Sequence, residues 1–138
     1  MATKESAVDS VLIVKDFFSA IDQKDEPSLA ALCAEDLEWI VPGEWAGAGT
    51  HRGHAGLKNL FTKAFETFDI VTSERHEFVA QGDRVIVIGL ATGKSKATNK
   101  TFEDHFVFAM TVRNGKVLKV REYIDTLALD RACDTTAK

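Results

Sequence analysis

The sequence predicts one α+β domain in which helices come first and an antiparallel sheet follows. Two observations support this fold class. Apolar residues recur at helical spacing as far as Phe68, and from Ile70 onward they alternate with a period of two. Tight-turn sequences at 81–83 and 113–115 then divide the second half into strands. Helices followed by such a meander pack together on one face of a sheet.

Three helices are expected. Residues 7–23 carry apolar side chains at helical spacing, Pro27 suits the first turn of a short helix that ends near Ala34, and apolar residues from Leu57 to Phe68 mark the third. Residues 43–56 are expected to form a glycine-rich loop. The expected strands cover residues 37–41, 70–80, 84–96, 101–112 and 116–125. The length of 138 residues suits a single domain, expected at 7–130, with polar tails at 1–6 and 131–138.

Composition excludes several classes of function. The net charge is −4 and the basic residues are scattered, which disfavours nucleic acid as a partner. No apolar run approaches the roughly 20 residues that span a bilayer, so no membrane association is expected. Cys33 and Cys133 lie far apart, which fits a reducing cytoplasm. Neither cysteine has a neighbour that would make it a nucleophile.

The hairpin around Asn114 decides which face of the sheet is inside. A two-residue turn would place Phe108 beside Arg121, whereas a three-residue turn at 113–115 places it beside Val120 and its apolar neighbours. A slip of one residue moves every side chain to the other face, so segregation of apolar residues favours the three-residue turn. The inner face then carries Phe106, Phe108, Met110, Leu118, Val120 and Ile124.

Two acids, Asp104 and Glu122, fall on this apolar face. An inward carboxyl group loses solvation and its pKa rises unless it is paired, which is a common device for acid or base chemistry near neutral pH. The alternative is that both acids lie at the rim of the sheet or hold structure together. On the neighbouring strand, Val87, Gly89 and Ala91 share a face with other small residues. These residues leave volume for a ligand or allow the sheet to bend.

The histidines give no metal site. His51 and His54 are three residues apart in a loop and have no third ligand at a suitable spacing. They border the mouth of a pocket or lie in solvent. No phosphate-binding loop or dinucleotide motif is present, so no cofactor is expected.

The chain resembles the ketosteroid isomerase-like or SnoaL-like branch of the NTF2-like superfamily over about residues 7–130. The similarity lies in the order of elements and in four phrases, at residues 38–43, 50–53, 113–117 and 121–125. The resemblance implies a cone in which a strongly curved, mostly antiparallel sheet holds three N-terminal helices in its concave face. It also implies a pocket at the wide end and a homodimer formed through the sheet.

The resemblance places Asp104 at the position of the protonated Asp of steroid isomerases. The positions of their Tyr and general base are occupied by Phe17 and Val41, so a standard 3-oxosteroid isomerase is disfavoured. A limonene-type epoxide hydrolase is disfavoured as well. Glu122 matches one of its acids, but Ala91 and Gly89 stand where its second Asp and its Arg belong.

The sequence therefore predicts a cofactor-free protein that performs acid/base chemistry on a small apolar carbonyl or hydroxyl compound. Asp104 is the expected hydrogen-bond donor or general acid, and Glu122 its partner acid or base. The expected pocket lining is Phe17, Trp39, Ile40, Phe61, Phe65, Val87, Gly89, Ala91, Phe106, Phe108, Val120 and Ile124. Two alternatives stay open: a non-catalytic binding or dimerisation domain, and a structural subunit whose pocket is filled by side chains.

Overall fold

The computed structural model describes residues 6–135. Within this range it contains helices α1 (Ala7–Asp22), α2 (Glu26–Leu32), α3 (Gly53–Thr67) and α4 (Thr126–Cys133). The strands are β1 (Cys33–Val41), β2 (Gly49–Arg52), β3 (Phe68–Gln81), β4 (Arg84–Ser95), β5 (Thr101–Arg113) and β6 (Lys116–Tyr123). The expected tail residues 1–5 and 136–138 lie outside the described residues.

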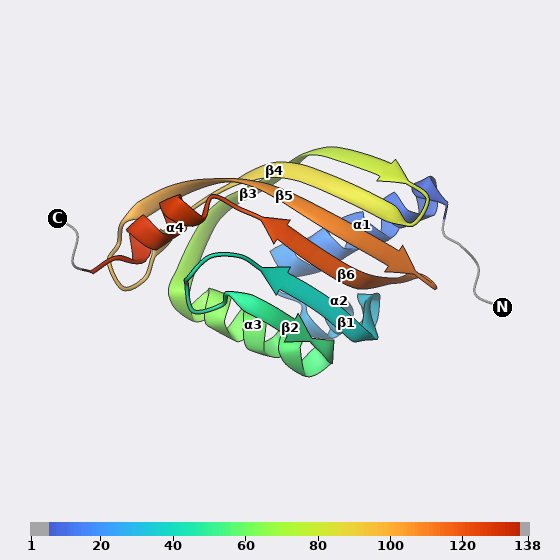
Figure 1. The fold of residues 1–138 in the computed structure, drawn as a ribbon, viewed down its shortest axis with the longest axis horizontal. Helices are drawn as coiled ribbons and strands as arrows, with labels where there is room; N and C mark the ends of the chain where they lie inside the picture. Colours follow the sequence, from blue (N-terminus) through green and yellow to red (C-terminus); the bar gives the residue numbers. More distant parts are fainter. Residues whose placement is uncertain (1–5, 136–138) are drawn as a thin grey trace.

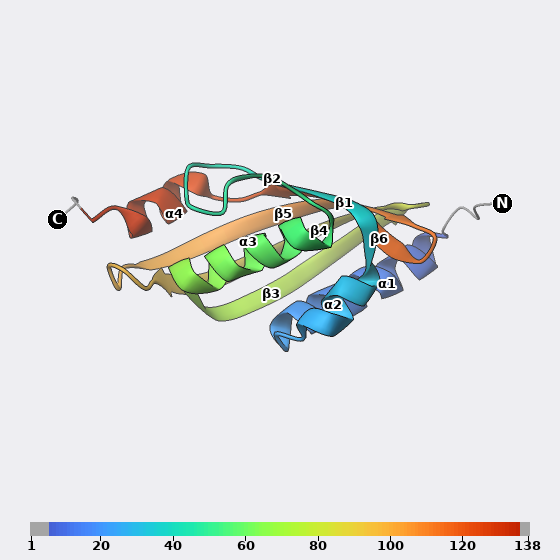
Figure 2. The ribbon, with the colours of Figure 1, turned by 90° about the horizontal axis from the view of Figure 1, so that it is seen from below.

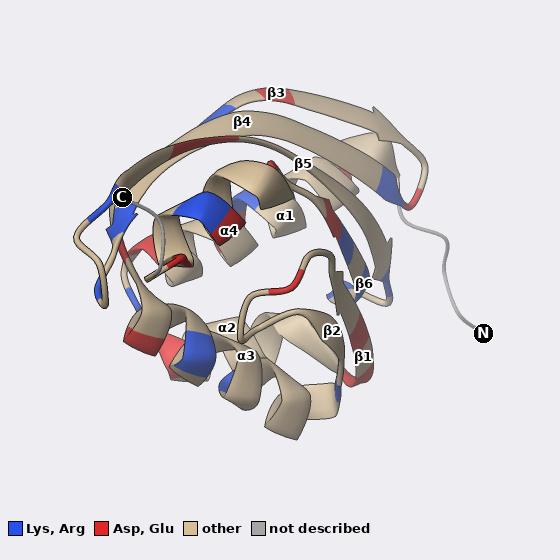
Figure 3. Cartoon of the chain, turned by 60° about the vertical axis from the view of Figure 1, so that its left-hand side comes forward, with Lys and Arg blue, Asp and Glu red and all other residues tan. Residues whose placement is uncertain are grey.

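All six strands form one sheet in the order β2-β1-β6-β5-β4-β3 (Figure 1). The β1–β6 pair is parallel and every other pair is antiparallel. The sheet arches over the helices, and α1, α2 and α3 lie on its concave side (Figures 2 and 3). The α+β cone predicted from the sequence is therefore confirmed.

Helix α1 is fixed at its N-terminal end by a cap and by a hydrogen bond to the sheet. Ser6 caps its N-terminus by accepting a hydrogen bond from the backbone N–H of Asp9 at 3.1 Å. Ser10 is fully buried and donates to the carbonyl oxygen of Gly82 in the β3–β4 turn at 2.8 Å. Val14 and Phe17 have no exposed surface and fill the cone on this side. The helix thus closes one end of the concave face.

The structure corrects several expected boundaries. Helix α2 ends at Leu32 and β1 begins directly at Cys33, earlier than the strand expected at 37–41. The expected glycine-rich loop contains β2, which pairs with β1, and the first residues of α3. Both segments are short and carry little apolar periodicity.

Helix α4 is absent from the sequence prediction, which ends the domain at residue 130. Asp125 caps the helix by accepting from the backbone N–H of Ala128 at 3.0 Å. The helix continues to Cys133 and buries Leu129 and Ala132 against Phe68 and Phe102. The first residues of the expected C-terminal tail are therefore part of the packed structure.

The β5–β6 hairpin has most of the expected inner face, but its turn and its register differ from the prediction. Arg113 pairs with Lys116, so the turn has two residues, Asn114 and Gly115, both with positive φ (54° and 76°). Such a turn matches the twist of a hairpin. An irregularity then follows, in which Leu118 is the extra residue between the Val112–Val117 and Thr111–Lys119 pairs. The bulge shifts the register by one residue in the opposite direction to the expected three-residue turn, so Phe108 pairs with Glu122 and not with Val120. Leu118, expected on the inner face, is the bulged residue, and Val117 is buried in the core instead.

Gly89 allows β3 to cross β4 closely. A Cβ atom on Gly89 would lie 2.1 Å from the carbonyl oxygen of Glu74 and 2.5 Å from Cζ of Phe106. The β3 strand has an irregularity at this level, between Arg75 and Glu77. The space beside Gly89 is filled by backbone and by an aromatic ring, so this glycine serves the bend of the sheet.

We expect Gly89→Ala to lower the free energy of unfolding by about 2–4 kcal/mol, because the backbone oxygen it meets cannot rotate away. Gly115→Ala is the matched control. A Cβ there meets nothing within 4 Å, although φ is +76°, so backbone strain of about 1 kcal/mol is the only expected cost. Urea denaturation of both variants measures the difference. Equal losses would refute the close approach at Gly89.

No helix among residues 6–135 is long and apolar enough to cross a membrane.

Candidate functional site

A cavity of about 450 Å³ lies between the helices and the concave face of the sheet. The helical wall is formed by α1 and α3, and the opposite wall by β3 to β6 together with Trp39 of β1. The volume lies within the range of small-molecule sites and far exceeds the few waters that a side-chain-filled pocket would leave. The lining is mostly apolar, with two carboxyl groups on the sheet wall.

Nine of the residues named from the sequence line this cavity. They are Trp39, Phe61, Phe65, Ala91, Asp104, Phe106, Phe108, Glu122 and Ile124. The other five do not. Val87 and Val120 lie on the inner face of the sheet and Phe17 lies on α1, but all three are fully buried in the core, and Gly89 is covered by Phe106. Ile40 lies on the opposite face of β1 from Trp39.

The sequence reasoning missed part of the lining. Phe18 and Ile21 of α1, Leu60 of α3, and Phe68 and Phe102 all contribute. Leu129 comes from α4, an element the sequence did not predict. Trp45, in the segment between β1 and β2, also lines the cavity and packs its ring against Phe68 with 5.2 Å between the centroids. The helical spacing of Phe18 and Ile21 could have identified them.

Asp104 lies near the end of β5 that faces α4. Its side chain is 7% exposed, and Oδ1 accepts a hydrogen bond from the backbone N–H of Asp125 at 2.7 Å. Burial raises the pKa of Asp104 to about 6, while the N–H of Asp125 opposes this rise by stabilising the carboxylate. Asp104 lines the cavity, so a ligand held there can reach its carboxyl group.

Glu122 lies on β6, and its cross-strand partner is Phe108. Its Oε1 accepts a hydrogen bond from the indole N–H of Trp39 at 2.7 Å. Trp39 pairs with Val120 on the parallel strand, so its ring reaches two residues further along β6. Burial raises the pKa of Glu122 to about 8, against the effect of Trp39, and the charge of Asp104 adds to the rise.

The two carboxyl groups are thus held in different protonation states near pH 7. Asp104, with the lower pKa, is mostly ionised, whereas Glu122 is mostly protonated. A pair of titratable groups whose environments separate their pKa values is the usual arrangement for one base and one acid. A hydrogen-bond donor orients each group. The backbone N–H of Asp125 orients Asp104, and the indole N–H of Trp39 orients Glu122.

The raised pKa of Glu122 predicts a pH-dependent stability difference. The folded state ionises Glu122 only near pH 8, whereas the ordinary pKa is 4.5, so its contribution to stability is full below about pH 4.5 and is lost as the pH rises through 8. Glu122→Gln removes this titration. We expect the variant to gain roughly 3–5 kcal/mol relative to the wild type as the pH rises from 5 to 9. Chemical denaturation across this pH range measures the gain, and a flat difference would contradict the assignment.

The histidines lie away from the cavity lining. Nε2 of His51 hydrogen-bonds the carbonyl oxygen of Gly47 at 2.7 Å, and Nε2 of His54 that of Cys33 at 3.0 Å. His51 is buried by this contact, and neither residue borders the pocket mouth. His105 is exposed on the outer face of β5, as the alternation predicted. Among residues 6–135, no three His, Cys, Asp or Glu side chains are grouped to hold a metal ion.

Both cysteines are free thiols. Cys33 is buried, and burial raises its pKa to about 12, so the thiolate is inaccessible near neutral pH. Burial also raises the pKa of Cys133. Neither cysteine lines the cavity.

The arrangement has the architecture of the NTF2-like proteins. The model of the SnoaL-like domain matches residues 14–120, and the chain belongs to this family.

Solved structures of similar proteins agree with this family assignment. An NTF2-like protein from Burkholderia xenovorans is 59% identical, with 94% of this chain and 98% of that chain covered and a TM-score of 0.88. An NTF2-like protein from Burkholderia thailandensis is 28% identical over 91% of this chain and 97% of that chain, with a TM-score of 0.83. TerC, co-crystallised with polyporic acid, shares the fold at 24% identity, with 91% of this chain and 98% of that chain covered and a TM-score of 0.82. No curated protein matches the chain.

Proposed function

We propose that the protein is a cofactor-free acid/base enzyme that moves protons on a small apolar carbonyl compound. The observation that carries this proposal is the pair of carboxyl groups, with pKa values of about 6 and about 8, lining one apolar cavity. An apolar site strengthens the hydrogen bonds that such groups make to a reacting molecule. Asp104 is the base, and Glu122 is the acid.

In this mechanism the Asp104 carboxylate removes a proton from the carbon next to the carbonyl group, while protonated Glu122 gives its proton to the carbonyl oxygen. The product of this step is an enol. With an unsaturated ketone, protonated Asp104 returns its proton to the far end of the conjugated enol while ionised Glu122 takes back the enol proton, which yields an isomer. With a β-hydroxy ketone, Asp104 instead protonates the hydroxyl group, which leaves as water while Glu122 takes back the enol proton. Both outcomes restore the carboxylate of Asp104 and the protonated carboxyl group of Glu122.

This assignment reverses the roles expected from the sequence, in which Asp104 was the protonated donor. The reason is the backbone N–H of Asp125, which favours the carboxylate form of Asp104. Burial raises the pKa of Glu122 against the effect of the one indole N–H it receives, and the charge of Asp104 raises it further, so Glu122 keeps its proton to a higher pH.

Deuterium exchange tests the proposal without knowledge of the physiological substrate. Apolar aryl ketones, beginning with 1-tetralone, are incubated with the protein in D₂O at pD 7, and label at the carbon next to the carbonyl is followed by NMR. We expect exchange well above the buffer rate for at least one ketone in the panel. Exchange at the buffer rate throughout the panel would count against catalysis.

A non-catalytic binding domain is the second candidate, and it is favoured by one observation. Phe17 and Val41, at the positions of the steroid isomerase Tyr and base, are buried in the core and do not line the cavity. In that case Asp104→Asn would keep full affinity for any ligand, and no ketone would exchange.

Two further features are proposals. A homodimer through the sheet is supported by the apolar outer face of β4 and β5, where Ile86, Ile88 and Val107 keep partial exposure, next to Tyr123, which is 53% exposed. A cytoplasmic location is supported by the two free thiols.

A further inference from the structure

Charged residues occur on both walls of the cavity, but only one of them is a cation. Asp104 and Glu122 belong to the sheet wall, whereas Asp22 and Lys24 belong to the helical wall, at the end of α1 and in its connection to α2. The partners of Asp22 and Lys24 decide the charge that a ligand meets on the helical wall.

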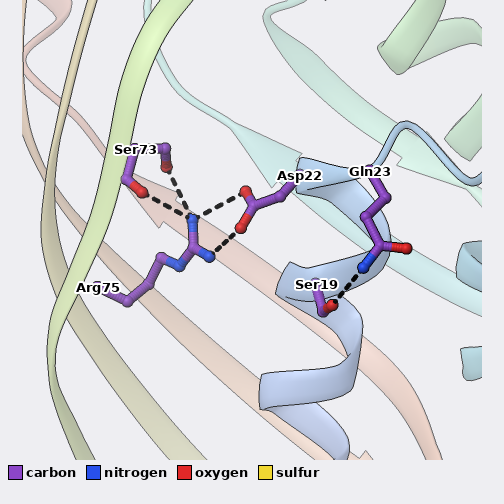
Figure 4. Close-up of polar contacts among 5 residues, drawn as sticks. All are labelled: Ser19, Asp22, Gln23, Ser73 and Arg75. Atoms are coloured by element: carbon purple, nitrogen blue, oxygen red, sulfur yellow. Dashed lines mark hydrogen bonds and ion pairs between the residues drawn. The ribbon is translucent and has the colours of Figure 1, made fainter.

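The charge of Asp22 is matched within the protein. Its Oδ1 accepts from Nη1 of Arg75 on β3 at 3.0 Å, and Oδ2 accepts from Nη2, so the contact is bidentate (Figure 4). The same guanidinium donates to the carbonyl and hydroxyl oxygens of Ser73, each at 3.1 Å, and lies 5.0 Å from the ring centroid of Phe18. Asp22 therefore joins α1 to β3 through Arg75.

The charge of Lys24 is unmatched. Its Nζ lies 5.3 Å from the ring centroid of Phe65, and it forms an ion pair with no residue in the range 6–135. The neighbouring Asp25 is used as the cap of α2, where it accepts from the backbone N–H and hydroxyl of Ser28 at 3.2 and 2.6 Å. Asp22 and Asp25, two of the three acids within two residues of Lys24, thus have other partners.

The backbone at Lys24 adds an independent observation. Its φ is +54°, in the left-handed region, at a position after a helix where glycine is the common residue. A side chain there costs roughly 1 kcal/mol relative to glycine. The chain carries a long cationic side chain at this strained position, and that side chain lines the cavity.

We propose that Lys24 binds a carboxylate on the substrate, so that the substrate is an apolar, aromatic-sized carbonyl compound with an acidic group at the end away from the reacting carbonyl. The carbonyl end meets Asp104 and Glu122 on the sheet wall, and the carboxylate meets Lys24 on the helical wall. The ring of Phe65 holds the ammonium group in place. This inference rests on the proposal that the cavity takes the substrate.

Two probes of matched shape test it: biphenyl-4-carboxylate and its methyl ester. Binding is followed at low ionic strength by the fluorescence of Trp39 and Trp45, which line the cavity. We expect the wild type to bind the acid about fivefold more tightly than the ester, since a partly solvated ion pair contributes up to about 1 kcal/mol. The preference should fall with added salt.

Lys24→Gln is expected to remove the preference for the acid and leave affinity for the ester unchanged, whereas Lys24→Arg retains the preference. Lys58→Gln, on the exposed side of α3, changes the net charge equally and should have no effect. Three results would overturn the inference: equal binding of the two probes by the wild type, a preference that survives in Lys24→Gln, or binding of neither probe.

The probes carry no exchangeable proton next to a ketone, so this experiment is independent of catalysis. A lost preference in Lys24→Gln together with failed deuterium exchange would leave an acid-binding pocket and reject the enzyme. Successful exchange with no preference for the acid would retain the enzyme and reject Lys24 as a substrate contact.

Discussion

Glu122→Gln is expected to lower the rate of exchange or turnover by about 10²–10⁴, the usual contribution of a positioned acid or base. The amide oxygen of Gln can still accept the hydrogen bond from Trp39, so the shape of the site is kept. The amide cannot give a proton to a carbonyl oxygen near neutral pH. The loss should therefore appear in kcat and in kcat/KM together.

The pH profile separates this loss from a packing defect. In the wild type, kcat/KM should rise through about pH 6 as Asp104 ionises and fall through about pH 8 as Glu122 ionises. The pH profile of the residual activity of Glu122→Gln should keep the rise near pH 6 and lose the fall near pH 8. If Glu122→Gln kept full activity, or kept both the rise near pH 6 and the fall near pH 8, Glu122 could not be the acid.

Asp104→Asn is expected to have the second large effect, again a loss of about 10²–10⁴, because the amide cannot accept a proton from carbon. The pH profile of the residual activity should lose the rise near pH 6, because that rise reports the ionisation of Asp104. Ligand affinity should change little, since the amide oxygen can accept the N–H of Asp125.

Glu103→Gln is the matched control for this variant. Glu103 precedes Asp104 on β5 but is exposed on the outer face, so the same loss of one charge should leave activity unchanged. If Asp104→Asn were as active as Glu103→Gln, the base would have to be another group.

The sequence was sufficient to identify the inner face of the sheet, because side chains alternate strictly along a strand. Alternation alone therefore places Asp104, Phe106, Phe108 and Glu122 together on that face. The hairpin turn could not be identified in the same way. A three-residue turn and a two-residue turn with a bulge at Leu118 shift the register by one residue in opposite directions. The two pairings differ by two residues and keep the same side chains inward, so apolar segregation cannot distinguish them.

The extent of the cavity could not be read from alternation. Val87 and Val120 share the inner face with Phe106 and Phe108, but they are fully buried in one core with Val14 and Phe17 of α1. Which part of the concave face stays open depends on where the helix lies along the sheet. That position is set by contacts between residues far apart in the sequence, such as Ser10 with the β3–β4 turn.

The division of roles between the two acids was also beyond the sequence. It depends on the N–H of Asp125, at the corner before an unpredicted helix, and on Trp39, which reaches Glu122 from a parallel strand. Parallel neighbours come from distant parts of the chain, so local patterns do not pair them. The presence of both acids was predictable, whereas their hydrogen-bond donors were not.

The most direct test of this account is a ¹³C NMR titration of the side-chain carboxyl carbons of Asp104 and Glu122 in the ligand-free protein, assigned with the Asp104→Asn and Glu122→Gln variants. We predict one ionisation near pH 6 that is lost in Asp104→Asn and another near pH 8 that is lost in Glu122→Gln. Titration of both groups below pH 5 would show that both are ionised at neutral pH, and would contradict the pairing of one base with one acid.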